Sequence, residues 1–119
     1  MLGLTFKPNT DDMREAPSIP LITALMDMGA MVRAYDPVGM EQARQVLAGI
    51  EFCDGPYACA KGADALVIVT EWEQFRALDF ERLKAVMKRA VLVDLRNVYH
   101  PEELHGFAYY GVGRGASGR

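Results

Sequence analysis

Several residue types that would mark a particular class of protein are scarce in this 119-residue chain. Its two cysteines, Cys53 and Cys59, are distant in sequence from its two histidines, His100 and His105, which makes a poor set of zinc ligands. A net charge of -3 leaves no basic surface for nucleic acid. No apolar run approaches the roughly 20 residues of a membrane span, and no secretory signal pattern opens the chain. These features favour a reduced, cytoplasmic protein, with both cysteines as ordinary core or surface thiols.

The first strand-to-helix turn also lacks the glycine-rich pattern, G-x-G-x-x-G, with which many nucleotide-binding domains hold a phosphate at a helix N-terminus. In its place, residues 3–18 read GLTFKPNTDDMREAPS. This segment begins as an apolar strand, breaks at Pro8 and continues as a charged loop to a helix start at Ser18. Long ordered loops between a strand and a helix tend to be functional, so this loop is the main functional clue in the sequence.

Apolar strand patterns alternate with helical patterns along the rest of the chain. Residues 65–70, ALVIVT, are the clearest strand, because they are apolar and β-branched as in a strand covered on both faces. Gly29 stands where a helix C-terminal glycine belongs, and Ser18 and Asp79 are predicted helix caps. We predict strands at 2–6, 30–35, 51–53, 65–70, 90–95 and 107–112, and helices at about 18–29, 40–47, 56–61 and 79–87.

This alternation predicts an α/β fold of the Rossmann-like, doubly wound type. We expect a mostly parallel sheet of about six strands in the order 3-2-1-4-5-6, with helices on both faces. One domain is expected over residues 1–112, followed by a flexible, glycine-rich tail over residues 113–119. The first strand has little room to begin before Leu2, so we expect an excised domain whose chain continues upstream.

Polar side chains follow several predicted strands at their carboxyl ends, which is where ligands bind in such sheets. Lys7 follows the first strand and Asp36 the second; Thr70 and Glu71 follow the fourth, and Arg96 the fifth. Lys7 and Arg96 would then flank one crevice and could clamp a diphosphate. Lysine would act as a point charge, and arginine could bind a phosphate in bidentate fashion.

Each of these residues also has a simpler interpretation. Lys7 could be a solvated surface lysine, and Arg96 could pair with Asp94 or cap a loop. Asp36 occupies the place of the ribose-binding acid of a dinucleotide fold, although that match is weak without the glycine fingerprint.

The charged loop and the segment after residue 70 leave alternatives open as well. Asp11 and Asp12 could ligate a metal, but adjacent aspartates in a loop more often form turns, and no metal site is predicted. Arg14 would pair with one of them or reach outward to a phosphate. Trp72 and Phe75 could stack on a base, although their position suits core packing better.

Residues 3–18 resemble the signature that opens the C-terminal, UDP-binding domain of UDP-glucose 6-dehydrogenases. Three later blocks resemble that domain in the same order: Tyr35-Asp36-Pro37, residues 69–75 (VTEWEQF) and Asp94-Leu95-Arg96-Asn97. Four blocks in register over nearly the whole chain are specific for the UDP-glucose/GDP-mannose dehydrogenase family. The sugar nucleotide stays open, with an N-acetylated UDP-hexosamine or GDP-mannose as alternatives.

The resemblance implies two Rossmann-like domains joined by a long central helix, usually in a homodimer, with NAD bound mainly by an N-terminal domain that this chain lacks. The family oxidises UDP-glucose to UDP-glucuronate with two NAD and water, through a thiohemiacetal and a thioester on a catalytic cysteine. Matches to the family motif imply that Phe6, Lys7 and Arg96 bind the UDP-sugar and that Arg14 approaches the NAD pyrophosphate. The catalytic cysteine belongs upstream, so no catalytic residue is assigned here and the chain alone is expected to be inactive.

Two other classes of function stay open. The chain could be a stand-alone nucleotide-binding or regulatory module, against which the short first strand argues. It could also be the complete NAD-binding domain of another oxidoreductase, against which the missing glycine fingerprint argues.

Overall fold

The structure is a computed structural model that describes residues 1–5, 9, 11–13, 16–100, 102, 104, 106–111 and 115–117, the last range for its backbone. Helices and short strands alternate along the chain, as the sequence predicts. The helices are α1 (Ser18–Asp27), α2 (Met40–Val46), α3 (Pro56–Ala60), α4 (Glu73–Arg76) and α5 (Phe80–Val86). The strands are β1 (Arg33–Ala34), β2 (Glu51–Phe52), β3 (Leu66–Ile68), β4 (Val91–Asp94), β5 (Ala108–Gly111) and β6 (Gly115–Ser117).

The strands form two sheets. In one, β1 pairs with β2; in the other the order is β3-β4-β5-β6. All these pairs are parallel except β5 with β6, which is antiparallel. β6 lies within the tail at 113–119, for which the sequence predicted no strand.

The predicted first strand, residues 2–6, is reduced among the described residues to one bridging residue, Leu2. Leu2 forms parallel bridges with Tyr35, directly after β1, and with Ile68 in β3. The prediction of one six-stranded sheet is therefore not confirmed among the described residues, whose strands form two sheets on either side of Leu2. The cause is Gly3, whose φ of +92° turns the chain out of the extended conformation directly after Leu2.

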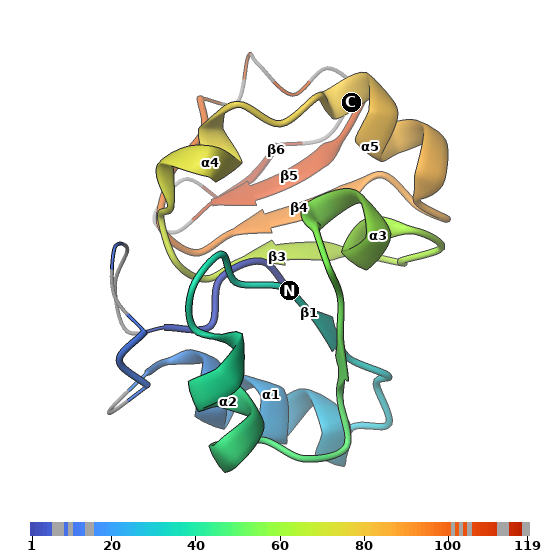
Figure 1. Ribbon diagram of the computed structural model, residues 1–119. Helices are drawn as coiled ribbons and strands as arrows, with labels where there is room; N and C mark the ends of the chain where they lie inside the picture. Colours follow the sequence, from blue (N-terminus) through green and yellow to red (C-terminus); the bar gives the residue numbers. More distant parts are fainter. Residues whose placement is uncertain are drawn as a thin grey trace.

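Helices cover both faces of the strands, which confirms the α/β fold with parallel strands. Along β3 the side chains alternate: Leu66 and Ile68 pack in one core with α3, α4 and α5, while Val67 and the following Val69 pack in a second core with α1 and α2. Figure 1 shows α1 and α2 together on one side of the strands and α4 and α5 on the other. The apolar run at 65–70 is thus explained by burial on two sides.

The predicted helix ends are partly right. Asp79 caps α5 by accepting a hydrogen bond from the amide of Arg82 at 3.1 Å, and Gly29 ends α1 at a positive φ of +92°. Ser18 is not the cap of α1: the N-cap residue is Pro17, and the Ser18 hydroxyl instead donates to the Leu4 carbonyl at 2.6 Å. This distant bond ties the start of α1 to the segment after Leu2. Within the described residues, no helix is long and apolar enough to cross a membrane.

Candidate functional site

The carboxyl ends of β1, β3 and β4 meet at one edge of the molecule, which we call the carboxyl edge. Thr5, Asp36, Thr70 and Arg96 lie there, each just after a strand or bridge. Of the predicted site residues, Phe6, Lys7 and Arg14 lie outside the described residues, so their roles stay predictions. The structure does place the residue before Phe6: the Thr70 hydroxyl donates to the Thr5 carbonyl at 2.8 Å.

Arg96 is brought to this edge by its own side chain. Its Nε donates to the carbonyl of Val69 at 2.9 Å, so the half-buried side chain extends from the end of β4 to the end of β3. Val69 directly precedes Thr70, which holds Thr5. Arg96 and Thr5 are therefore bonded to consecutive residues, Val69 and Thr70, at the end of β3. This agrees with the expectation that the segments after the first and fifth predicted strands lie at one edge of the sheet.

Asp94 shapes the turn that carries Arg96. Its Oδ1 accepts from the main-chain amide of Arg96 at 3.2 Å, and its Oδ2 accepts from the Tyr99 amide at 3.0 Å and the Tyr109 hydroxyl at 2.8 Å. Asp94 is fully buried. The carboxylate that sequence reasoning considered as a partner of the Arg96 side chain thus receives the Arg96 backbone and organises the turn.

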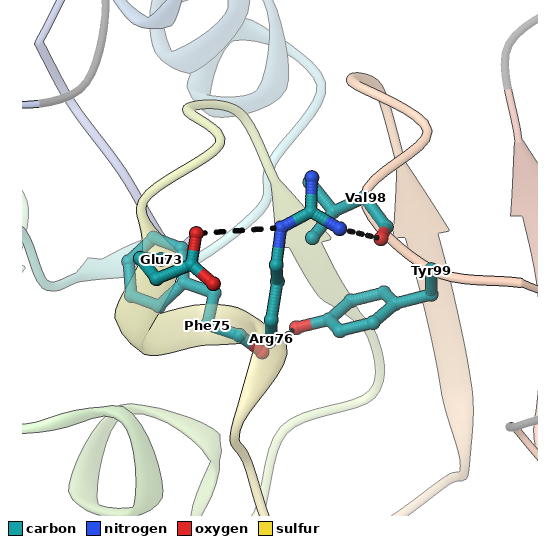
Figure 2. A network of polar contacts seen from close by, with 5 residues as sticks. All are labelled: Glu73, Phe75, Arg76, Val98 and Tyr99. Carbon is teal, nitrogen blue, oxygen red and sulfur yellow. Dashed lines mark hydrogen bonds and ion pairs between the residues drawn. The ribbon is translucent and has the colours of Figure 1, made fainter.

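The loop after β4 is also fastened to α4, as Figure 2 shows. Arg76 Nη1 donates to the Val98 carbonyl at 3.0 Å, and the Tyr99 hydroxyl donates to the Phe75 carbonyl. On its other side Arg76 faces Glu73, with 3.8 Å between Nε and Oε2. These bonds hold the turn that bears Arg96 against a helix, and so limit its movement.

Asp36 is the most highly bonded side chain of the edge, and sequence reasoning missed this role. It is fully buried. Its Oδ1 accepts from the amides of Val38 at 3.0 Å and Gly39 at 2.7 Å. Its Oδ2 accepts from the amides of Leu4 at 2.8 Å and Thr5 at 3.2 Å, and also from Thr5 Oγ1 and Trp72 Nε1. A carboxylate so occupied by protein donors does not suit the ribose hydroxyl that the weak dinucleotide match suggested.

Gly39 is required by this arrangement. A Cβ at Gly39 would lie 2.3 Å from Cγ2 of Thr5 and 3.3 Å from Oδ1 of Asp36. The sequence D-P-x-G, in which an aspartate bonds amides two and three residues later, is a turn signal that could have indicated this structural role.

The aromatic residues after β3 are core residues. Trp72 is 7% exposed and Phe75 is fully buried, and Phe75 packs edge-to-face on Tyr35 with ring centroids 6.4 Å apart. This confirms core packing over base stacking. Of the adjacent aspartates, Asp11 is exposed and Asp12 is half-buried. Within the described part of the chain, no group of three or more His, Cys, Asp or Glu could hold a metal ion.

Cys53 and Cys59 are buried free thiols near the opposite ends of the strands. Burial, followed by the neighbouring Cys59 and then Glu51, raises the pKa of Cys53 from 9.0 to about 11. Cys59 Sγ lies 3.7 Å from the Met1 amine and 3.6 Å from the Met1 carbonyl oxygen. A thiol with a raised pKa is a poor nucleophile, in keeping with the prediction that neither cysteine is catalytic.

Comparison with known families matches residues 1–101 to the UDP-binding domain of the UDP-glucose/GDP-mannose dehydrogenase family. The chain belongs to this family. The resemblance drawn from the four sequence blocks is confirmed, and the family assignment fits a chain whose blocks gather at one strand edge.

Curated relatives of this UDP-binding domain include the UDP-glucose 6-dehydrogenase of Rhizobium meliloti, 58% identical over 96% of this chain and 26% of that protein. The UDP-glucose 6-dehydrogenase of Pseudomonas aeruginosa is 48% identical over 98% of this chain and 27% of that protein. The chain therefore spans about a quarter of the length of these relatives.

Solved structures agree with the fold of the UDP-binding domain. A UDP-D-ManNAc dehydrogenase from Pyrococcus horikoshii has a TM-score of 0.79 and 32% identity over 96% of this chain and 25% of that one. A UDP-glucose dehydrogenase from Pyrobaculum islandicum has a TM-score of 0.78 and 36% identity over 93% of this chain and 24% of that one.

Proposed function

We propose that this chain is the UDP-binding part of an NAD-dependent UDP-glucose 6-dehydrogenase and that it positions the UDP portion of the substrate. The observation that carries the proposal is the meeting of the family blocks at the carboxyl edge, where Arg96 and Thr5 are bonded to Val69 and Thr70. The relatives at 58% and 48% identity, both named UDP-glucose 6-dehydrogenase, support the choice of substrate.

In this proposal Phe6, Lys7 and Arg96 contact the sugar nucleotide. Lys7 and Arg96 bind the diphosphate, each by charge-assisted hydrogen bonds of about 1.5–3 kcal/mol where water is excluded. The net reaction converts UDP-glucose, two NAD and water to UDP-glucuronate, and this domain supplies binding and orientation. Its two cysteines do not carry the chemistry, because both are buried and Cys53 has a raised pKa.

The described residues do not offer an NAD site of the Rossmann kind. The acid at the end of β1, Asp36, is buried and occupied by protein donors, and residues 3–18, which follow the first predicted strand into a helix, have no G-x-G-x-x-G. We propose that NAD is held mainly by the remainder of the enzyme and that Arg14 approaches its pyrophosphate across the interdomain cleft. We further propose that the enzyme is a cytoplasmic homodimer, which sedimentation and cell fractionation would test.

We also propose that the strands follow the order 3-2-1-4-5-6, numbered as predicted from the sequence. This order is supported by Leu2, which bridges in parallel to the ends of both sheets and so occupies the place of strand one. Protection of the Leu2 and Val69 amides from hydrogen exchange is the expected sign of this central position, since each donates to the other segment at 2.7 Å and 2.9 Å.

The test is kinetic, in the full-length dehydrogenase. Lys7→Ala and Arg96→Ala are each expected to raise KM for UDP-glucose about 10-fold or more, since one lost charge-assisted bond is worth about 1.5 kcal/mol or more. Arg14→Ala is expected to raise KM for NAD instead. Wild-type KM for UDP-glucose in both the Lys7 and Arg96 variants would overturn the assignment.

A second substrate class is supported by one observation, the similarity to the UDP-D-ManNAc dehydrogenase structure. The ratio of kcat/KM for UDP-glucose to that for UDP-ManNAc, with GDP-mannose as a third substrate, decides between them. Calorimetric binding of UDP to the enzyme with no turnover of any sugar nucleotide would instead favour the stand-alone binding module.

A further inference from the structure

The two residues before the charged loop, Leu4 and Thr5, are held through their main chain by side chains from three other segments. Asp36, after β1, accepts both amides. Ser18, at the start of α1, donates to the Leu4 carbonyl at 2.6 Å, and Thr70, after β3, donates to the Thr5 carbonyl at 2.8 Å. All four main-chain polar groups of this dipeptide thus have a side-chain partner that is distant in sequence.

All these groups are buried, so the bonds are not shared with water. Thr5, Asp36, Thr70 and Ser18 are each fully buried, as is Leu4. A buried polar group that loses its partner costs the full desolvation penalty, so each bond constrains the position of the dipeptide strongly.

Packing limits the dipeptide further. A Cβ on Gly3 would lie 2.6 Å from both the backbone nitrogen and Cβ of Thr70. On the other side, Cγ2 of Thr5 lies against Gly39, where a Cβ would be 2.3 Å away. The chain entering the loop is therefore enclosed by the residues after β1 and after β3.

The returning side of the loop is anchored near the same place. Met13 and Ala16 are buried in the core that also contains Leu4 and Val69, and the Ala16 amide donates to the Met13 carbonyl at 3.2 Å. The described residues on either side of the loop, Thr5 and Met13, are therefore both buried.

We propose that Asp36 and Thr70 are positioning residues for the sugar-nucleotide site: they fix Thr5, and thereby the point from which Phe6 and Lys7 reach the substrate. This rests on the proposed function, in which Phe6 and Lys7 contact the UDP-sugar. Neither Asp36 nor Thr70 touches substrate, and each acts through the main chain of Thr5.

Asp36 suits this role because both of its oxygens accept. Oδ1 faces two amides of the turn at residues 38–39, and Oδ2 faces the Leu4 and Thr5 amides and Trp72 Nε1. Asp36→Asn keeps the shape but replaces one acceptor with an NH₂ donor. In either orientation of the amide, donors then face donors.

Thr70 allows a milder change. Thr70→Val removes the hydroxyl that holds the Thr5 carbonyl and keeps the volume, whereas Thr70→Ser keeps the hydroxyl. The matched control is Tyr35→Phe, which also removes a hydroxyl that bonds to a segment distant in sequence, since it donates to Oε1 of Gln74 at 3.1 Å. The control bond joins the residue after β1 to α4 and touches neither Thr5 nor the turn that bears Arg96.

The experiment combines steady-state kinetics of the full-length dehydrogenase with hydrogen exchange at single amides. We expect Asp36→Asn and Thr70→Val to raise KM for UDP-glucose about 5- to 10-fold, the loss of about one hydrogen bond, with kcat at saturation within about twofold. Thr70→Ser should restore KM, and Tyr35→Phe should leave it unchanged at a similar loss of Tm.

Exchange reports the anchoring directly. In Asp36→Asn the amides that face the new NH₂ group, either those of Leu4 and Thr5 or those of Val38 and Gly39, should exchange at least about 10-fold faster. The Leu95 amide, which donates to the Ile68 carbonyl at 3.0 Å, should keep its rate. Where Asp36→Asn does not fold, Thr70→Val and Thr70→Ser carry the kinetic test by themselves.

Two results would overturn the proposal. One is unchanged KM in Thr70→Val; the other is a rise of KM in Tyr35→Phe equal to that in Thr70→Val, which would show general destabilisation. Failure of the proposed function is seen separately, since the wild-type enzyme would then neither bind UDP nor oxidise UDP-glucose. In that case wild-type exchange rates at all four amides, those of Leu4, Thr5, Val38 and Gly39, in Asp36→Asn would still refute the anchoring.

Discussion

The two ends of the parallel strands are built in different ways. At the carboxyl edge, Asp36, Asp94 and Thr70 are fully buried and form hydrogen bonds to segments distant in the sequence. At the amino edge, an open hollow of about 1010 Å³ is bordered by residues such as Met1, Met31, Ile50 and Cys59. One end is thus a closed polar network, and the other is an open and partly apolar surface.

The difference shows that the loops at the carboxyl edge are held more rigidly than those at the amino edge. Within the described residues, no buried side-chain nitrogen or oxygen lacks a hydrogen-bond partner. Much of that polar bonding lies where loops leave the strands, which is where ligands bind in such sheets. Hydrogen bonds have preferred directions and apolar contacts do not, so the carboxyl edge can fix a loop more narrowly than the amino edge can.

Among substitutions that compare the two edges, Gly39→Ala at the carboxyl edge is expected to lower stability most. The added Cβ would lie 2.3 Å from Cγ2 of Thr5, so the free energy of unfolding should fall by about 1–3 kcal/mol, the cost of overpacking. Urea denaturation measures the loss. Gly55→Ala is the matched control, because nothing lies within 4 Å of a Cβ there, and it should change stability by less than about 0.5 kcal/mol.

A double substitution sharpens this test. Thr5→Ser removes the methyl group that Gly39→Ala meets and keeps the hydroxyl that donates to Asp36. Gly39→Ala combined with Thr5→Ser should therefore be more stable than Gly39→Ala alone. Simple additivity of the two losses would contradict the close contact between Thr5 and Gly39.

A smaller, pH-dependent effect is expected at the amino edge. The pKa of Cys53 is raised from 9.0 to about 11, so the folded state binds the thiol proton more tightly than the unfolded state. The stability that this proton contributes is fully present below pH 9 and is lost as the pH rises from about 9 to about 11. Cys53→Ala should flatten this part of the curve of unfolding free energy against pH.

Alkylation checks the same pKa independently. The rate of iodoacetamide labelling at Cys53 should rise about tenfold per pH unit until near pH 11, because the thiolate is the reactive form. A rate that levels off near pH 9 would show an ordinary thiol at this position.

The smallest effect is expected for Met31→Gln, on the rim of the hollow. Met31 is 99% exposed, so the substitution should change the free energy of unfolding by no more than about 0.5 kcal/mol. Thermal unfolding of the 119-residue chain gives the comparison. A loss as large as that of Gly39→Ala would mean that the amino edge is closed by contacts of Met31 in solution.

Much of the fold could be predicted because its signals are local. The continuous apolar run around β3, the Asp79 cap and the glycine after α1 all depend on neighbours in the sequence. Ser18 was assigned as a cap because that is its commonest local role, but a tertiary bond to Leu4 takes its hydroxyl. The first strand was overestimated because the positive φ of Gly3 is not visible in an apolar sequence.

The candidate site could be predicted in part for a related reason. Arg96 is predicted because it follows a strand; the structure places it at the carboxyl edge, and its binding role stays a prediction. Asp36 was noticed but misinterpreted, since four of its six donor bonds come from Leu4, Thr5 and Trp72, which only folding brings to it. Phe6, Lys7 and Arg14 lie outside the described residues and stay predictions.

The main-chain anchoring of Leu4 and Thr5 has a consequence for how substrate preference can evolve or be redesigned. Their amides and carbonyls are held by Asp36, Ser18 and Thr70, and amides and carbonyls are the same whatever side chains follow. The interior of the loop can therefore be exchanged between family members while its attachment points keep their geometry. Libraries that vary residues 8–12 and conserve Phe6, Lys7 and these three anchors are the natural starting point for redirecting the proposed dehydrogenase to another sugar nucleotide.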